Sequence, residues 1–322
     1  MKKILITGGS GFIGSHLVKY FLKNGQKVAI TTKYDSVFDN IRLASVWKKL
    51  TVIESDLRNL DSIKKIKKFK PDIIFHLAAY NDVGGSFENQ NEALTSNLIA
   101  TTNLLESLDV FEQFIYISTS EVYGFQKTVP FQENMIPQPI SPYSIGKYAG
   151  ELYANMHMKF YNKPVKIIRP FNAYGPGQSM KAVIPEIIIK CLRGQKIITT
   201  EGLQTREFNF VEDLVSGFVA CSKSKKTLRN IYNIGSNYEI RIKDLVLLIH
   251  ELTESRSKLG IGLLKKRKTD ISRMKSDYSK FNKETGWQPR IKLTEGLKIT
   301  IEWYKKYLHL FEDPNSALTN IF

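Results

Sequence analysis

Four residues in the middle of the chain have the types and spacing needed to move a proton at a substrate hydroxyl. Tyr143 and Lys147 lie four positions apart in SPYSIGK, so a helix would place them on one face. A lysine ammonium lowers the pKa of a neighbouring phenol, which would let Tyr143 act as a base near neutral pH. Thr119 and Glu121 follow the apolar segment QFIYIS and could add a hydroxyl and a carboxylate to the same site.

The segments around these residues predict elements that would bring them together. Residues 113–118 read as a buried strand, and catalytic groups of open α/β sheets lie at the carboxyl ends of strands. Ser141 and Pro142 read as the N-cap and first residue of the helix that carries Tyr143. A Tyr-x-x-x-Lys pair by itself is common on surface helices, so its interpretation depends on the rest of the fold.

A glycine-rich turn near the start of the chain predicts a dinucleotide site. Gly8 and Gly11 lie between the apolar segment 2–7 and the amphipathic segment 12–24, and Gly14 lies in the first turn of the second segment. Glycines let the backbone approach a pyrophosphate closely, and the amino end of the following helix supplies N–H donors and a positive dipole. The strand–turn–helix context favours this interpretation over a simple tight turn.

The ends of the second and third predicted strands bear on which dinucleotide binds. An acidic residue after the second strand would bind a ribose 2′-hydroxyl, whereas a basic residue suits a 2′-phosphate. Residues 27–32 are followed by Lys33, so the sequence favours NADP over NAD. Asp56 and Leu57 follow the strand predicted at 50–55, where the aspartate could bind the adenine amino group or simply cap the next helix.

Composition narrows the class of protein. The 322 residues carry 47 basic and 31 acidic side chains, a net charge of +16, with 42% hydrophobic residues. The lysines lie in short, dispersed clusters, which favours solvated helix faces over a nucleic-acid partner. No apolar run is long enough to span a membrane, two cysteines are too few for a disulfide framework, and the five histidines lack metal-ligand spacing. We therefore expect a cytoplasmic protein without a bound metal.

Apolar strands alternate with helical patterns through the first two-thirds of the chain. Further strands are expected at 71–79 and 163–170, and a helix around 91–107. Continuous apolar strands separated by helices indicate a parallel sheet covered on both faces. The predicted fold is α/β: a Rossmann-type doubly wound parallel sheet with a smaller C-terminal α/β lobe for substrate.

Taken together, the motifs resemble those of extended short-chain dehydrogenases/reductases of the nucleotide-sugar epimerase and dehydratase family. The matching segments are GGSGFIGSHL, HLAA, STSEVYG, SPYSIGK, RPFNAYGPGQ, TREFNFVEDL and GWQP, in that order over nearly the whole chain. The resemblance implies a tightly bound NADP or NAD that is regenerated in each cycle, a UDP- or GDP-linked hexose as substrate, and a homodimer packed through two helices per subunit. It divides the chain into a dinucleotide-binding domain at 1–170, to which 205–238 return, and a nucleotide-sugar-binding lobe at 171–204 and 239–322.

The resemblance also implies roles for individual residues. Thr119, Tyr143 and Lys147 would form the hydride-transfer set, with Tyr143 and Lys147 also binding the cofactor. The remaining cofactor positions are Phe12, Ile13 and Ala78, in addition to the glycines, Lys33, Asp56 and Leu57. The substrate positions are Ser86, Ser120, Asn172, Arg206 and Arg267, of which the two arginines would bind the diphosphate.

Glu121 favours one reaction within this family. Oxidation at sugar C4 acidifies the C5 proton, and a carboxylate that removes it allows water to leave from C6. The Thr-Ser-Glu segment resembles 4,6-dehydratases acting on GDP-mannose or N-acetylglucosamine nucleotides, although dTDP-glucose enzymes have Asp where this chain has Ser120. A 4-epimerase, a decarboxylase, a simple C4 dehydrogenase and a non-catalytic dinucleotide sensor remain as alternatives.

Overall fold

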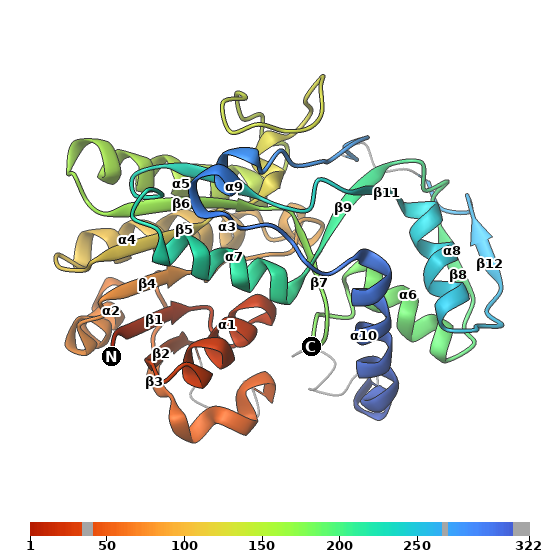
Figure 1. Ribbon diagram of the computed structural model, residues 1–322, viewed down its shortest axis with the longest axis horizontal. Helices are drawn as coiled ribbons and strands as arrows, with labels where there is room; N and C mark the ends of the chain where they lie inside the picture. Colours follow the sequence, from red (N-terminus) through yellow and green to blue (C-terminus); the bar gives the residue numbers. More distant parts are fainter. Residues whose placement is uncertain (34–40, 266–269, 312–322) are drawn as a thin grey trace.

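The computed structural model describes residues 1–33, 41–265 and 270–311 (Figure 1). Seven parallel strands form one large sheet in the order β10-β6-β5-β4-β1-β2-β3. Their bounds are β1 (Lys3–Thr7), β2 (Lys27–Thr32), β3 (Thr51–Glu54), β4 (Ile73–His76), β5 (Gln113–Ile117), β6 (Val165–Pro170) and β10 (Ile231–Ile234).

Helices cover both faces of this sheet, which is why most residues of its strands are apolar. On one face lie α1 (Phe12–Lys23) and α7 (Val211–Lys223), which pack against each other and share one buried core. On the other lie α2 (Leu60–Phe69), α4 (Ala100–Ser107) and α5 (Pro142–Phe160). The predicted α/β fold with a doubly wound parallel sheet is confirmed.

The helix expected around 91–107 is interrupted. It consists of α3 (Gln90–Leu94), one π-helical turn at Thr95–Ile99, and α4. Within the π turn, the Asn97 amide accepts a hydrogen bond from the Tyr80 N–H at 2.8 Å and donates to the Tyr80 carbonyl at 3.2 Å. The turn therefore fixes the loop that leaves β4, beside the carboxyl edge of the sheet.

Helix α5 begins where the sequence predicts. Ser141 is its N-cap and Pro142 its first residue. The Ser141 hydroxyl accepts a hydrogen bond from the Ser144 N–H at 3.1 Å, and the Ser144 hydroxyl accepts one from the Ser141 N–H at 3.0 Å. This reciprocal cap fixes the first turn, which carries Tyr143.

A smaller lobe lies beside the carboxyl edge of the large sheet (Figure 1). Its strands are β7 (Asn172–Tyr174), β8 (Ile197–Thr199), β9 (Thr205–Phe210), β11 (Glu239–Arg241) and β12 (Leu259–Ile261), in the orders β11-β9-β7 and β12-β8. Its helices α6 (Val183–Leu192), α8 (Ile242–Leu252) and α10 (Leu293–Lys306) share a separate core. Of residues 205–238, α7 and β10 pack in the layers of the large sheet, whereas β9 pairs in the smaller one. Helix α9 (Ser279–Thr285) packs against β10.

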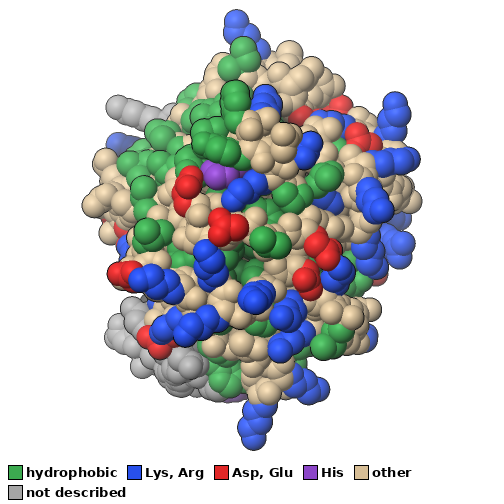
Figure 2. Space-filling model, turned by 90° about the vertical axis from the view of Figure 1, so that its left-hand side faces the viewer, with side chains coloured by type: hydrophobic (Ala, Val, Ile, Leu, Met, Phe, Trp, Pro, Cys, Tyr) green, Lys and Arg blue, Asp and Glu red, His purple; other side chains and the backbone are tan. Residues whose placement is uncertain are grey.

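The surface carries its basic side chains in a dispersed pattern. Figure 2 shows one face of the molecule, on which Lys and Arg side chains are spread among acidic, polar and apolar ones. No helix in the described ranges is long and apolar enough to cross a membrane.

Candidate active site

Two adjoining cavities lie at the carboxyl edge of the large sheet. The outer pocket, of about 410 Å³, lies beyond the ends of β2 and β3, and its charged lining residues are Lys33, Asp56, Arg58 and Glu92. The central cavity, of about 390 Å³, extends from the glycine turn to the smaller lobe. Its lining includes the predicted residues Phe12, Ile13, Thr119, Ser120, Glu121, Tyr143, Lys147 and Asn172. Gly8 and Gly11 line both cavities, so the glycine turn joins them.

The glycine turn has the shape that a pyrophosphate requires. Gly8 has φ of +67°, and a Cβ atom there would lie 2.8 Å from the Ala78 nitrogen. A Cβ atom on Gly14 would lie 2.2 Å from the Gly8 carbonyl oxygen, so α1 can start this close to β1 only with glycine. Gly11 caps α1 without a side-chain hydrogen bond, and the first turn of α1 has no acidic residue. These features fit a phosphate group at the start of α1.

Tyr143 and Thr119 meet in the central cavity. Burial raises the pKa of the Tyr143 phenol to about 12, and a hydrogen bond with the Thr119 side chain opposes this shift. The direction is opposite to the one expected from the Tyr-x-x-x-Lys spacing. The Lys147 amine donates a hydrogen bond to the Ile117 carbonyl oxygen at 2.5 Å.

Lys147 lines the cavity beside a buried polar network centred on Glu151. Burial lowers the pKa of its amine to about 7, and the charge of Glu151, one turn further along α5, opposes the shift. The Glu151 carboxylate accepts hydrogen bonds from the Ser118 hydroxyl at 2.5 Å and from the Arg169 guanidinium at 2.5 to 3.2 Å. This network joins α5 to β6 and to the end of β5, so it fixes the position from which Lys147 faces the site.

Glu121 is the carboxylate of the central cavity. Its backbone N–H donates to the Thr119 hydroxyl at 3.2 Å, at the start of a short 3-10 helix, Ser120–Tyr123. Burial raises the pKa of the Glu121 carboxyl, while the positive charge of Arg206 lowers it and Asp270 raises it further. A carboxylate whose pKa is raised is a stronger base than an ordinary one, which suits a residue that takes up a proton from substrate.

Only some of the predicted substrate residues line the central cavity. Ser120 and Asn172 line the central cavity, and the Asn172 amide donates to the Glu207 carbonyl at 3.1 Å. Ser86 is fully buried, donates to the Val83 carbonyl at 2.7 Å, and lies outside both cavities. Arg206 donates to Asp270 at 2.7 Å and to the Ile271 carbonyl at 2.6 Å, outside the cavity lining. Arg267 lies outside the described residues.

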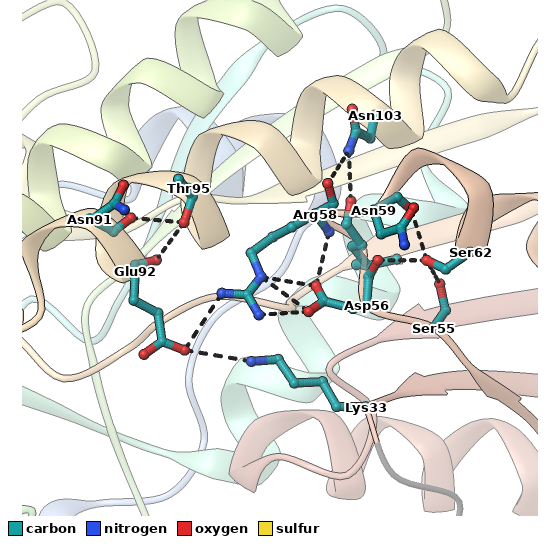
Figure 3. Close-up of polar contacts among 11 residues, drawn as sticks. Lys33, Ser55, Asp56, Arg58, Asn59, Ser62, Asn91, Glu92, Thr95 and Asn103 are labelled. Atoms are coloured by element: carbon teal, nitrogen blue, oxygen red, sulfur yellow. Dashed lines mark hydrogen bonds and ion pairs between the residues drawn. The ribbon is translucent and has the colours of Figure 1, made fainter.

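The outer pocket holds four charged side chains in contact (Figure 3). Lys33 Nζ lies 3.5 Å from Glu92 Oε1, and Arg58 Nη1 lies 3.9 Å from the same oxygen. The Arg58 guanidinium also donates to both Asp56 carboxylate oxygens, at 2.6 to 3.2 Å, which lowers the pKa of Asp56. Leu57 and Ala78 complete the predicted cofactor residues in this lining. Lys33, expected as a partner for a phosphate, therefore already faces a carboxylate.

Sequence reasoning missed Arg58 and Glu92. Glu92 lies on α3, and no motif links that helix to β2 or to the loop after β3. The signal for Arg58 was its place two residues after Asp56, at the end of a predicted strand. Among the described residues, no cluster of His, Cys, Asp and Glu side chains could hold a metal ion.

Comparison with known proteins bears on the activity. The family model described as GDP-mannose 4,6 dehydratase matches residues 5–300. Human dTDP-D-glucose 4,6-dehydratase is 33% identical over 98% of this chain and 94% of its own length.

Solved structures with the same fold include 4-epimerases. UDP-glucose 4-epimerase from Thermotoga maritima, solved with UDP-glucose, is 30% identical, with a TM-score of 0.88 over 95% of this chain and 99% of its own. UDP-glucuronic acid 4-epimerase from Bacillus cereus, solved with UDP-glucuronic acid and NAD, is 28% identical, with a TM-score of 0.85 over the same shares. With its glycine turn, its Thr119–Tyr143–Lys147 constellation and these relatives, the chain belongs to the NAD-dependent nucleotide-sugar epimerase/dehydratase family of extended short-chain dehydrogenases/reductases.

Proposed function

We propose that this protein is a nucleotide-sugar 4,6-dehydratase that forms a 4-keto-6-deoxy sugar. The observation that carries the proposal is Glu121, a partly buried carboxyl with a raised pKa in the same cavity as Thr119 and Tyr143. Epimerisation at C4 needs only the oxidising residues, whereas dehydration also needs a group that removes the C5 proton. The match to the dehydratase family model and the human dehydratase supports the same activity.

The glycine turn and the outer pocket would hold the dinucleotide. The N–H groups at the start of α1 suit its pyrophosphate, and the outer pocket suits its adenosine half. Bound in its oxidised form, the dinucleotide would supply a hydride acceptor and a positive charge. We propose NAD as this cofactor, because Lys33 is paired with Glu92 and because the B. cereus relative was solved with NAD.

Tyr143 and Thr119 act on the C4 hydroxyl. Thr119 orients the hydroxyl, and Tyr143 accepts its proton as C4 becomes a ketone. With a pKa of about 12, the phenol is protonated in the free site, so it needs added positive charge before it accepts that proton. Lys147, held by Ile117 and by the network around Glu151, supplies a nearby amine that can gain or lose a proton near pH 7.

Glu121 then carries out the elimination. Its carboxylate takes the C5 proton and delivers it to the C6 hydroxyl, which leaves as water. The hydride lost from C4 ends on C6, and C5 regains a proton from solvent through Glu121. The proton released from the C4 hydroxyl balances the one gained by C5, so the net change is loss of one water.

A 4-epimerase is the second candidate. The structural similarity to the T. maritima epimerase and the presence of Ser120 in place of a second acid favour it. The test is incubation with UDP-, GDP- and dTDP-linked hexoses, followed by mass spectrometry of the products. Loss of the mass of one water supports the dehydratase, whereas an isomer of unchanged mass overturns it in favour of the epimerase.

Replacement of Glu121 by Gln separates the two half-reactions. We expect Glu121→Gln to oxidise C4 but to eliminate water about 10²- to 10⁴-fold more slowly, because the amide cannot accept the C5 proton. Reduced cofactor should accumulate and be visible by its near-ultraviolet absorbance. Glu133→Gln, a partly buried acid outside the central cavity, is the control and should retain full turnover. Unimpaired dehydration by Glu121→Gln would contradict the mechanism.

A further inference from the structure

We propose that Glu92 makes the outer pocket select NAD over NADP, by occupying the cations that would otherwise bind a 2′-phosphate. This inference rests on the proposed binding of a dinucleotide. The acidic residue that discriminates between NAD and NADP would then lie on helix α3. The sequence pattern would instead place such a residue at the end of β2.

The described side chains that line the pocket carry equal numbers of positive and negative charges. Among its described lining residues, the charged side chains are two cations, Lys33 and Arg58, and two carboxylates, Asp56 and Glu92. Arg58 is held by three hydrogen bonds from its guanidinium to Asp56, and Glu92 lies within 4 Å of both cations. Figure 3 shows Glu92 extending from α3 toward Arg58 and Lys33.

This arrangement suits a diol better than a phosphate. A phosphate monoester at this position carries roughly 1.5 to 2 negative charges and would meet cations that already face carboxylates. A ribose 2′-hydroxyl can instead donate a hydrogen bond to a carboxylate, as acidic residues do in other dinucleotide sites. The pocket therefore favours the uncharged 2′-hydroxyl.

The ion pairs of Glu92 contribute little to the stability of the fold. The Lys33 side chain is 46% exposed and that of Glu92 is 44% exposed, and exposed ion pairs of this kind contribute little to folding. Glu92 can thus be replaced without unfolding the chain. Its charge still acts on a ligand in the pocket, since removal of one charge at this range changes affinity for an anion by about tenfold.

The test measures binding rather than turnover. Isothermal titration with NAD and with NADP is applied to the wild type, Glu92→Gln and Lys33→Gln, and dinucleotide that co-purifies is released and identified by mass spectrometry. The wild type should bind NAD at least about tenfold more tightly than NADP. Glu92→Gln should raise NADP affinity about tenfold and change NAD affinity less than about threefold. Lys33→Gln should weaken NADP further.

The matched control is Glu88→Gln. Glu88 is an exposed acid four residues earlier that does not line the pocket, so its replacement should leave the NAD-to-NADP ratio unchanged. Tighter binding of NADP by the wild type, an unchanged ratio in Glu92→Gln, or an equal shift in Glu88→Gln would overturn the selectivity. Failure of the folded wild type to bind either dinucleotide would overturn the proposed function itself, and the selectivity with it.

Discussion

At the scale of single residues, the chemistry depends on how burial sets the pKa values of a few groups. Tyr143, Lys147 and Glu121 all line one cavity, and burial shifts each pKa toward the neutral form of the group. Groups poised in this way exchange protons with each other and with substrate at lower cost than fully charged ones. Arg206 and Glu151 provide charges that oppose these shifts from outside the cavity lining.

Replacement of Tyr143 by Phe tests the base directly. We expect Tyr143→Phe to reduce kcat by about 10²- to 10⁴-fold, because Tyr143 supplies the only phenol among the described residues that line the cavity. Dinucleotide affinity should change little, since the glycine turn and outer pocket are intact. Steady-state turnover and isothermal titration provide the two measurements. Tyr148→Phe, on the same helix but outside the cavity lining, should behave as the wild type, and turnover of Tyr143→Phe at the wild-type rate would exclude the phenol as the base.

At the scale of elements, the side chain of one buried histidine links strand β4 to strand β1 and helix α4 through hydrogen bonds. His76 ends β4, and its Nδ1 lies 2.7 Å from the hydroxyl of Thr7, which ends β1. Its Nε2 lies 3.0 Å from the hydroxyl of Thr101 on α4. The Thr7 hydroxyl accepts a hydrogen bond from the Ala78 N–H and the Thr101 hydroxyl donates to the Asn97 carbonyl, so a neutral imidazole satisfies the whole chain of hydrogen bonds.

This histidine should make the fold sensitive to acid. Burial, aided by the charge of Lys147, lowers the pKa of His76 to about 3, whereas an unfolded histidine titrates near its ordinary value of 6.5. Between these values the unfolded chain binds a proton that the folded chain does not, so the free energy of unfolding falls as pH falls from 6.5 toward 3. One such proton contributes a slope of about 1.4 kcal/mol per pH unit at most.

Denaturant unfolding at a series of pH values measures this slope. We expect His76→Gln to be less stable at pH 7, because it disturbs the hydrogen bonds to Thr7 and Thr101, but to show a shallower decline below pH 6.5. The exposed histidine His309 is the matched control, and His309→Gln should retain the wild-type slope. An unchanged slope in His76→Gln would show that other groups dominate the acid response.

At the scale of the whole molecule, two neighbouring segments form an exposed apolar surface on which we expect a dimer to form. Ile145 and Leu152 on α5 are 47% and 49% exposed, and Leu94 and Ile99 beside α5 are 38% and 37% exposed. Large exposed apolar side chains that cluster in this way are typical of interaction surfaces. We predict that a second copy of the chain covers them, through the helix that carries Tyr143.

A charge placed on this surface should dissociate the dimer. Leu152→Glu is expected to sediment as a monomer at concentrations where the wild type is a dimer, because a carboxylate cannot be buried there without a partner. Leu247→Glu, an exposed leucine of α8 in the smaller lobe, is the control and should leave the assembly unchanged. A monomeric wild type in sedimentation equilibrium would contradict the prediction.

The sequence alone determined the features that depend on contiguous residues. The parallel sheet follows from predominantly apolar strands alternating with helices, and the cap of α5 follows from Ser141 and Pro142. The glycine spacing that allows α1 to begin against β1 is equally local. Each of these features is set by backbone preference or by burial on two faces, and both leave a readable pattern over a few residues.

Only the tertiary structure decided the features that depend on desolvation and on contacts between distant segments. The Tyr143–Lys147 spacing predicted a lowered phenol pKa, but burial raises it and the Ile117 carbonyl holds the lysine. Lys33 suggested NADP from its place in the sequence, but Glu92 reaches it from a helix nearly sixty residues away. The energy of a charge depends on all the groups around it in space, and no spacing along the chain records which carboxylate the fold brings beside a given cation.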